Sequence, residues 1–151
     1  MFRGIHEITL DAKGRLSVPA KLRAVFEEKS DGKMVMTADL ERNLMIYTLP
    51  EWQDVEAKLS KLPSLDKRAR QIKHLFMGYA SELELDGTGR VLIPTPLRKY
   101  AGLDKKVTLI GMINKLELWD SATWEAKRES DVAELLAEGA DLGEALENLS
   151  I

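Results

Sequence analysis

The residues best suited to chemistry in this sequence are two arginines that hold the same position in two related turns. Asp-Ala-Lys-Gly-Arg at residues 11–15 recurs as Asp-Gly-Thr-Gly-Arg at residues 86–90, 75 positions later. Each copy follows an alternating stretch and precedes an apolar step that ends in proline. Arginine can donate two hydrogen bonds to guanine O6 and N7, and it also pairs well with phosphate. The repeated turn therefore favours a surface that binds nucleic acid.

The first and fourth residues of each turn predict its conformation. Asp11 and Asp86 can accept hydrogen bonds from backbone amides two residues further on, and Gly14 and Gly89 tolerate a positive φ. The pattern is typical of a type I turn closed by a glycine bulge. The two aspartates would then orient the turns and their arginines. A generic turn with a plain Asp–Arg salt bridge is the alternative interpretation, and the recurrence in matching contexts counts against it.

The elements around the turns also repeat. Each copy is expected to contain a hairpin, a short helix, a second hairpin and a longer helix, because alternating and helical apolar patterns follow one another in that order. In the first copy these elements are predicted at residues 4–10 with 15–18, 20–28, 33–37 with 43–49, and from 50 onward. In the second copy they are predicted at residues 82–85 with 91–93, 94–100, 106–111 with 115–119, and from 120 onward. A unit of about 50 residues buries too little surface to be stable alone, so the copies should pack together or interleave around one core.

The chain is expected to divide into four segments. These are an N-terminal repeat at 1–60, a linking helix at 61–77, a C-terminal repeat at 78–130 and an acidic tail at 131–151. The linking helix carries several Lys and Arg residues, which form either a solvated face or a second surface for phosphate contacts. The tail would be either a helix that docks on a neighbouring subunit or a frayed end.

Composition limits the classes of function. Of 151 residues, 44% are hydrophobic and 31% charged, as in ordinary globular proteins. No apolar run approaches the roughly 20 residues of a membrane span, no apolar signal core is found, and the absence of cysteine excludes thiol chemistry. We therefore expect a cytoplasmic protein without membrane partners. The net charge of −3 hides a basic region, because residues 60–110 carry ten Lys/Arg against five Asp/Glu and residues 111–151 carry three against ten.

Catalytic motifs find little support. His6 falls on the apolar face of a strand and His74 on the basic helix, and neither has an evident partner for metal binding or acid–base chemistry. The Gly-Thr-Gly of residues 87–89 lacks the spacing of a phosphate-binding loop, and the segment after Asp11 lacks the spaced carboxylates of a calcium loop. We expect no enzyme activity, no metal, no cofactor and no small-molecule substrate.

The two Asp-x-x-x-Arg turns, together with three further motifs, resemble the MraZ family of bacterial transcriptional regulators. The motifs are Phe-Arg-Gly at residues 2–4, Gly-Arg-Leu-Ser-Val-Pro at 14–19 and Gly-Arg-Val-Leu-Ile-Pro at 89–94. The resemblance covers essentially the whole chain. It implies an α+β fold of two tandem AbrB-like swapped-hairpin repeats, assembled into a ring-like homo-oligomer. It further implies binding to direct repeats in promoters of the division and cell-wall gene cluster, including the protein's own, and association with the nucleoid.

The resemblance and the turn chemistry together give a set of candidate contacts. Arg15 is the first candidate for base contact, and the N-terminal turn should dominate because Thr88 stands where the first turn has Lys13. The residues predicted to contact DNA are Arg15, Lys13, Arg3, Arg23, Lys21 and Arg90, with Asp11, Gly14, Asp86 and Gly89 orienting the turns. The rival class is an oligomeric protein-binding or assembly module without direct DNA readout, since fold does not fix function.

Overall fold

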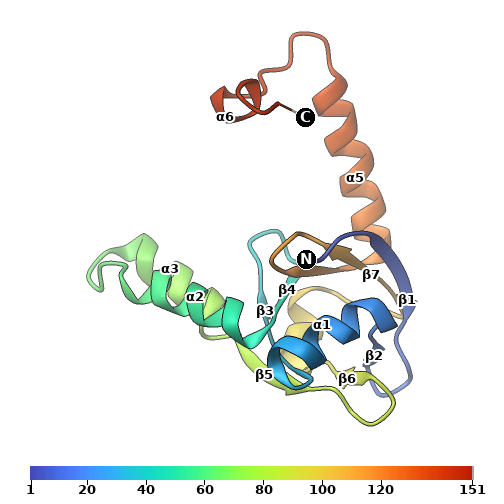
Figure 1. The fold of residues 1–151 in the computed structure, drawn as a ribbon. Coiled ribbons are helices and arrows are strands. Elements are labelled where there is room, and N and C mark those ends of the chain that lie inside the picture. Colours follow the sequence, from blue (N-terminus) through green and yellow to red (C-terminus); the bar gives the residue numbers. More distant parts are fainter. Residues whose placement is uncertain (151) are drawn as a thin grey trace. The chain divides into compact units, whose positions relative to one another are not determined.

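A computed structural model describes residues 1–150, which fall into two compact units, residues 1–121 and the segment that begins at Ala122. The first unit is an α+β structure of short helices and mostly antiparallel strands, as expected (Figure 1). Its strands are β1 (Ile5–Thr9), β2 (Arg15–Ser17), β3 (Lys33–Ala38), β4 (Leu44–Tyr47), β5 (Ser81–Glu84), β6 (Arg90–Leu92), β7 (Lys106–Gly111) and β8 (Leu116–Asp120). Its helices are α1 (Ala20–Ser30), α2 (Leu49–Ser60), α3 (Lys67–Phe76) and α4 (Thr95–Tyr100).

The two copies exchange strands within one chain. Six strands form an antiparallel sheet in the order β1-β7-β8-β4-β3-β5, and β2 and β6 form a separate pair. The first strand of each copy thus lies against the other copy: β1 pairs with β7, and β5 pairs with β3. β4 and β8, which are equivalent in the two copies, join the halves in the middle of the sheet. Of the two arrangements expected, packing together or interleaving around one core, the structure has the interleaved one.

Two predicted hairpins are wrong, those of residues 4–10 with 15–18 and of 82–85 with 91–93. Their turns form, but the strands on either side of each turn do not pair with each other. Around the first turn, the Asp11 amide donates to the Arg15 carbonyl at 3.2 Å, and beyond it β1 and β2 take different partners. β2 instead pairs with β6, with Leu16 opposite Val91. Because both side chains are almost fully buried, the pairing between copies adds to the core, whereas a local hairpin would leave it incomplete.

Helices α1 and α4 close this core from equivalent positions. Each begins directly after a proline, Pro19 or Pro94, whose fixed φ suits the start of a helix. Leu22 and Phe26 of α1 and Leu97 of α4 are buried in the same hydrophobic cluster as the β2–β6 pair. The first helix of each copy is therefore fixed close to the strand pair that carries the turns.

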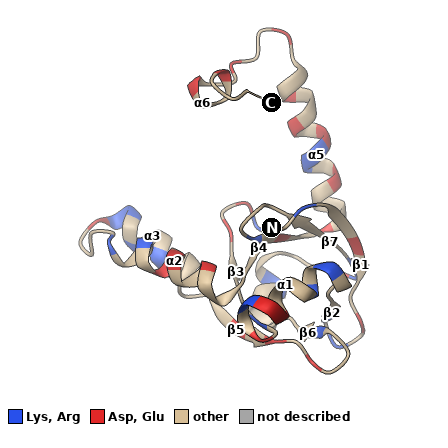
Figure 2. Cartoon of the chain, in the orientation of Figure 1, with Lys and Arg blue, Asp and Glu red and all other residues tan. Residues whose placement is uncertain are grey.

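The linking helix expected at 61–77 is shorter than predicted. Helix α3 begins only at Lys67, because the Asp66 carboxylate caps it by accepting a hydrogen bond from the Ala69 amide at 3.2 Å. Leu65 lies in the loop that precedes α3 and is 90% exposed. Basic residues gather at the start of α3, as the blue segment in Figure 2 shows. Lys67, Arg68 and Arg70 there are solvent-exposed.

The second unit consists of most of α5 (Ser121–Leu136) and a short α6 (Glu144–Glu147). The segment between α5 and α6 contains Gly139 and Gly143, and both glycines have positive φ. Apolar side chains of this unit, including Leu135 and Leu136, are exposed to solvent. Across residues 1–150, no helix has both the length and the apolar character needed to cross a membrane.

Candidate nucleic-acid interface

The first turn is held by one carboxylate. Asp11 Oδ1 accepts hydrogen bonds from the backbone amides of Lys13 and Arg15, each at 2.9 Å, and Oδ2 accepts one from Arg15 Nε at 2.6 Å. The Gly14 amide donates to the Asp11 carbonyl at 3.0 Å, and Gly14 has a φ of +82°. These contacts confirm the predicted type I turn with a glycine bulge. They also form the Asp–Arg salt bridge of the plainer interpretation, so the two interpretations are compatible.

The second turn repeats this arrangement with one change. Asp86 accepts from the Arg90 amide at 3.0 Å and from Arg90 Nε at 3.1 Å, and Gly89 has a φ of +77°. Thr88 donates to Asp86 Oδ1 through both its amide and its hydroxyl, each at 2.9 Å. The threonine thus replaces the positive charge of Lys13 with an additional hydrogen bond that closes the turn.

The same hydrogen bonds control the charge of both aspartates. The hydrogen bond from the Arg15 amide is the main cause of a lowered pKa at Asp11, and the hydrogen bond from the Arg90 amide similarly lowers the pKa of Asp86. Both carboxylates are therefore ionised at neutral pH. Each arginine has a fixed negative charge beside its Nε, which orients the guanidinium group.

The fold brings the two turns together. In the β2–β6 pair, Arg15 lies opposite Leu92 and Arg90 lies opposite Ser17. Nη1 of Arg90 comes within 3.9 Å of the carboxylate of Asp11, so the second arginine also interacts with the first turn's aspartate. Residues 75 positions apart in the sequence thus form one continuous site.

Part of each arginine remains available for a ligand. The side chains of Arg15 and Arg90 are 28% and 32% exposed. Their Nε atoms bind aspartate, whereas no hydrogen bond to another of residues 1–150 engages their terminal amino groups. Two parallel N–H donors on a fixed guanidinium group can contact guanine or phosphate.

The other predicted contacts are distributed unequally. Lys13 is exposed on the first turn, and Lys21 is exposed in the first turn of α1. Arg23, also on α1, lies against Gly89 of the second turn. Arg3 is not brought to this site: it precedes β1, whereas the turn follows it, and a five-residue strand spans about 15 Å.

Sequence reasoning missed Arg98. A Cβ built on Gly14 would lie 2.2 Å from Nη1 of Arg98, so this guanidinium group covers the first turn just as Arg23 covers the second. Arg98 follows Arg23 by 75 positions, the same interval that separates Arg15 from Arg90. Applying the repeat interval to every candidate would have identified it.

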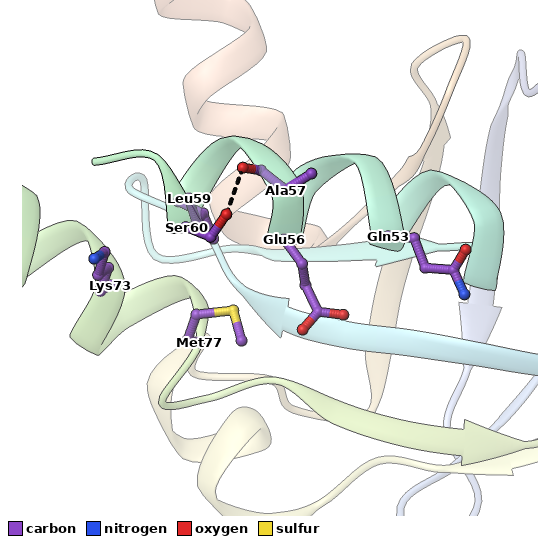
Figure 3. Close-up of a pocket in the computed structure, with 7 residues that line it drawn as sticks. All are labelled: Gln53, Glu56, Ala57, Leu59, Ser60, Lys73 and Met77. Atoms are coloured by element: carbon purple, nitrogen blue, oxygen red, sulfur yellow. Dashed lines mark hydrogen bonds between the residues drawn. The ribbon is translucent and has the colours of Figure 1, made fainter. Parts of the chain in front are cut away.

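The groove beside α2 is separate from the predicted DNA contacts. A groove of about 500 Å³ lies beside α2 and is bordered by Glu56, Lys73 and Met77 (Figure 3). Its only hydrogen bond among the residues drawn joins the Ser60 hydroxyl to the Ala57 carbonyl at 2.8 Å. None of the predicted DNA contacts lines it. In the part of the chain that the structure describes, no group of three or more His, Cys, Asp or Glu residues could hold a metal ion.

The fold and the site together define a class: a protein of two interleaved repeats whose Asp–Arg turns meet at one strand pair. The sequence profile of the family described as "MraZ protein, putative antitoxin-like" matches residues 1–75 and again residues 75–141. The chain belongs to the MraZ family, which confirms the resemblance and the tandem repeat.

Relatives of the same length support this assignment. The chain is 48% identical over 152 residues to "Transcriptional regulator MraZ" of Coxiella burnetii (strain RSA 493 / Nine Mile phase I), with all of both chains covered. It is 47% identical over 152 residues to the protein of that name from Halorhodospira halophila, and 48% over 153 residues to that from Escherichia coli O9:H4, again with both chains fully covered. The family is one of transcriptional regulators and not of enzymes, in agreement with the prediction for this chain.

Proposed function

We propose that this protein is a sequence-specific DNA-binding regulator of transcription and that its two turns act as one reading element. The observation that carries the proposal is the 3.9 Å approach of Arg90 to Asp11, since it places two turns that are distant in sequence, with their arginines, at one site. The names of the relatives support a role in transcription.

The turn geometry suggests how bases would be read. The major groove admits a two-stranded β-ribbon, and a narrow turn can enter it in the same way. Asp11 and Asp86 hold Arg15 and Arg90 by Nε and leave the terminal amino groups for guanine O6 and N7. Less side-chain entropy is then lost on binding, because the guanidinium groups are already oriented.

Phosphate contacts would position the turns on the duplex. Lys13 is an exposed cation on the first turn and Lys21 is one on α1, whereas the second turn has Thr88 in place of Lys13. We expect the first turn to provide more of the affinity and Arg90 to contribute to base recognition. Arg3 lies at the opposite end of β1 from the turn and would contribute little to this site.

Several copies would have to act together on one promoter. One pair of turns offers few contacts, whereas specific protein–DNA interfaces bury roughly 1,000 Å² or more of protein surface. A ring-like homo-oligomer that presents identical turns would match short direct repeats and gain affinity through multivalency. The proposed targets are promoters of the division and cell-wall gene cluster, including the protein's own, bound in the cytoplasm at the nucleoid.

The test uses fluorescence anisotropy of a labelled duplex from upstream of the protein's own gene. A shuffled duplex of the same composition controls for sequence, and Lys58→Ala, which removes an exposed charge from α2, controls for net charge. Wild type and Lys58→Ala should prefer the native duplex, with affinity that falls steeply as salt rises, and Arg15→Ala should lose the preference. Wild type that bound neither duplex would contradict the proposal and favour the protein-binding module.

A further inference from the structure

The two copies exchange side-chain contacts at the turns as well as strands. Arg98 of the second copy packs on Gly14 of the first turn, and Arg23 of the first copy packs on Gly89 of the second. A Cβ on either glycine would lie 2.2 Å or 1.8 Å from Nη1 of the arginine that covers it. Each turn therefore includes one arginine from its own copy and one from the other.

Backbone hydrogen bonds fix this exchange. The Ile93 amide donates to the Gly14 carbonyl at 3.1 Å, and the Val18 amide donates to the Gly89 carbonyl at 3.1 Å. Each donor lies two residues before the start of α4 or α1, and the covering arginine is the fourth residue of that helix. The position of each covering arginine thus follows from the contact between the turn and the opposite copy.

The covering arginines lack the aspartates that hold Arg15 and Arg90. Among the residues that the structure describes, Arg98 donates one hydrogen bond, from Nη2 to Thr95 Oγ1 at 3.0 Å, and its buried Nε has no hydrogen-bond partner. Within residues 1–150 the side chain of Arg23 has no hydrogen bond or ion pair. Both side chains are half-buried, and a partly desolvated cation without a counter-charge is unfavourable. A bound anion would remove that cost.

From this contrast we infer that Arg98 and Arg23 bind DNA phosphates beside the turn of the opposite copy. The inference rests on the proposed function and assigns different DNA contacts to the four arginines. Arg15 and Arg90, held by aspartate, read bases. Arg98 and Arg23, unpaired and packed on the turn glycines, hold the phosphate backbone, because a guanidinium group matches two phosphate oxygens.

The test measures anisotropy with the native and the shuffled duplex at several salt concentrations. Phosphate contacts carry no sequence information, so Arg98→Ala should weaken binding to both duplexes by a similar factor, about tenfold or more. The slope of log affinity against log salt should also decrease, by about 0.9 for each subunit engaged on DNA. Arg23→Ala should behave in the same way, whereas Lys58→Ala should match wild type.

Two comparisons separate a phosphate contact from structural support of the turn. Arg98→Lys keeps the charge and should retain the wild-type salt slope while losing part of the affinity. If Arg98→Ala lost affinity but kept the wild-type slope, Arg98 would only support the turn, and the inference would be overturned. If Arg98→Ala bound DNA as well as wild type does, the inference about Arg98 would also be overturned. The proposed function would still be supported in that case if Arg15→Ala lost the sequence preference. If wild type bound neither duplex, both would fail.

Discussion

At the scale of single residues, Asp11 and Asp86 determine how the turn arginines are presented. Each carboxylate accepts hydrogen bonds from two backbone amides of its own turn and from the Nε of its arginine. An acidic residue beside a DNA contact is unfavourable for phosphate, yet it orients a guanidinium group without using its terminal donors. The aspartate therefore favours base contact over phosphate contact for the arginine that it holds.

The lowered pKa of Asp86 predicts how the stability of this turn depends on pH. Because the hydrogen bonds from the Arg90 and Thr88 amides favour the ionised form, the stabilisation is fully present above the ordinary value of 3.8 and is lost as pH falls through the lower folded-state pKa. Asp86→Asn should lower the thermal midpoint by a constant amount above about pH 5, and the difference should narrow below about pH 4. A difference that changed between pH 6 and 8 would contradict this assignment.

Replacement by alanine should have unequal effects on stability at the two glycines of the second turn. Gly89 has a φ of +77° and is covered by Arg23, whereas a Cβ on Gly87 would meet nothing within 4 Å. Gly89→Ala should lower the free energy of unfolding by about 1–2 kcal/mol from backbone strain alone, and displacing Arg23 should add to this. Gly87→Ala serves as the control and should remain within about 0.5 kcal/mol of wild type in urea unfolding. Equal effects of the two variants would show that the turn conformation does not require glycine at 89.

At the scale of elements, the β2–β6 pair is the structure on which the site depends. It is only three residues long on each side, yet Leu16 is fully buried and lies opposite the buried Val91. Leu16→Ala should reduce the free energy of unfolding by about 2–5 kcal/mol through lost burial and a cavity. Leu92→Ala, at a site that is 54% exposed, should change it by about 0.5 kcal/mol or less. Urea unfolding measures both, and a small effect at Leu16 would contradict its place in the core.

Sequence patterns predicted which strands and helices form more accurately than which strands pair with one another. Alternation identified β1 and β5, and proline with helical spacing identified α1 and α4, because those signals are local. The predicted pairing of β1 with β2 was wrong, because alternation shows which face of a strand is buried but not which strand lies beside it. Helix α3 begins later than the predicted linking helix because Asp66 acts as its N-cap. Arg98 was missed because its role depends on contact between copies.

At the scale of the whole molecule, strand exchange makes the two repeats mutually dependent. Without the second copy, β1 would lose β7, β2 would lose β6, and β3 would lose β5. A fragment of residues 1–77 should therefore be unfolded or paired with a second copy of itself, and never a folded monomer. Circular dichroism and sedimentation test this, and mixing with a fragment of residues 78–151 should restore the fold. A monomeric fragment 1–77 with cooperative unfolding would contradict the interleaved core.

The same exchange of strands between the copies forms the proposed DNA-binding site, because the two turns meet where β2 pairs with β6. A double-mutant cycle on Arg15 and Arg90 tests this central claim most directly. Anisotropy would compare wild type, Arg15→Ala, Arg90→Ala and the double variant on the native and shuffled duplexes. If the turns form one reading element, each single variant should lose most of the sequence preference, and the double variant should lose little more. An Arg90→Ala protein that kept the full wild-type preference, or effects that simply added, would show that the turns do not act together.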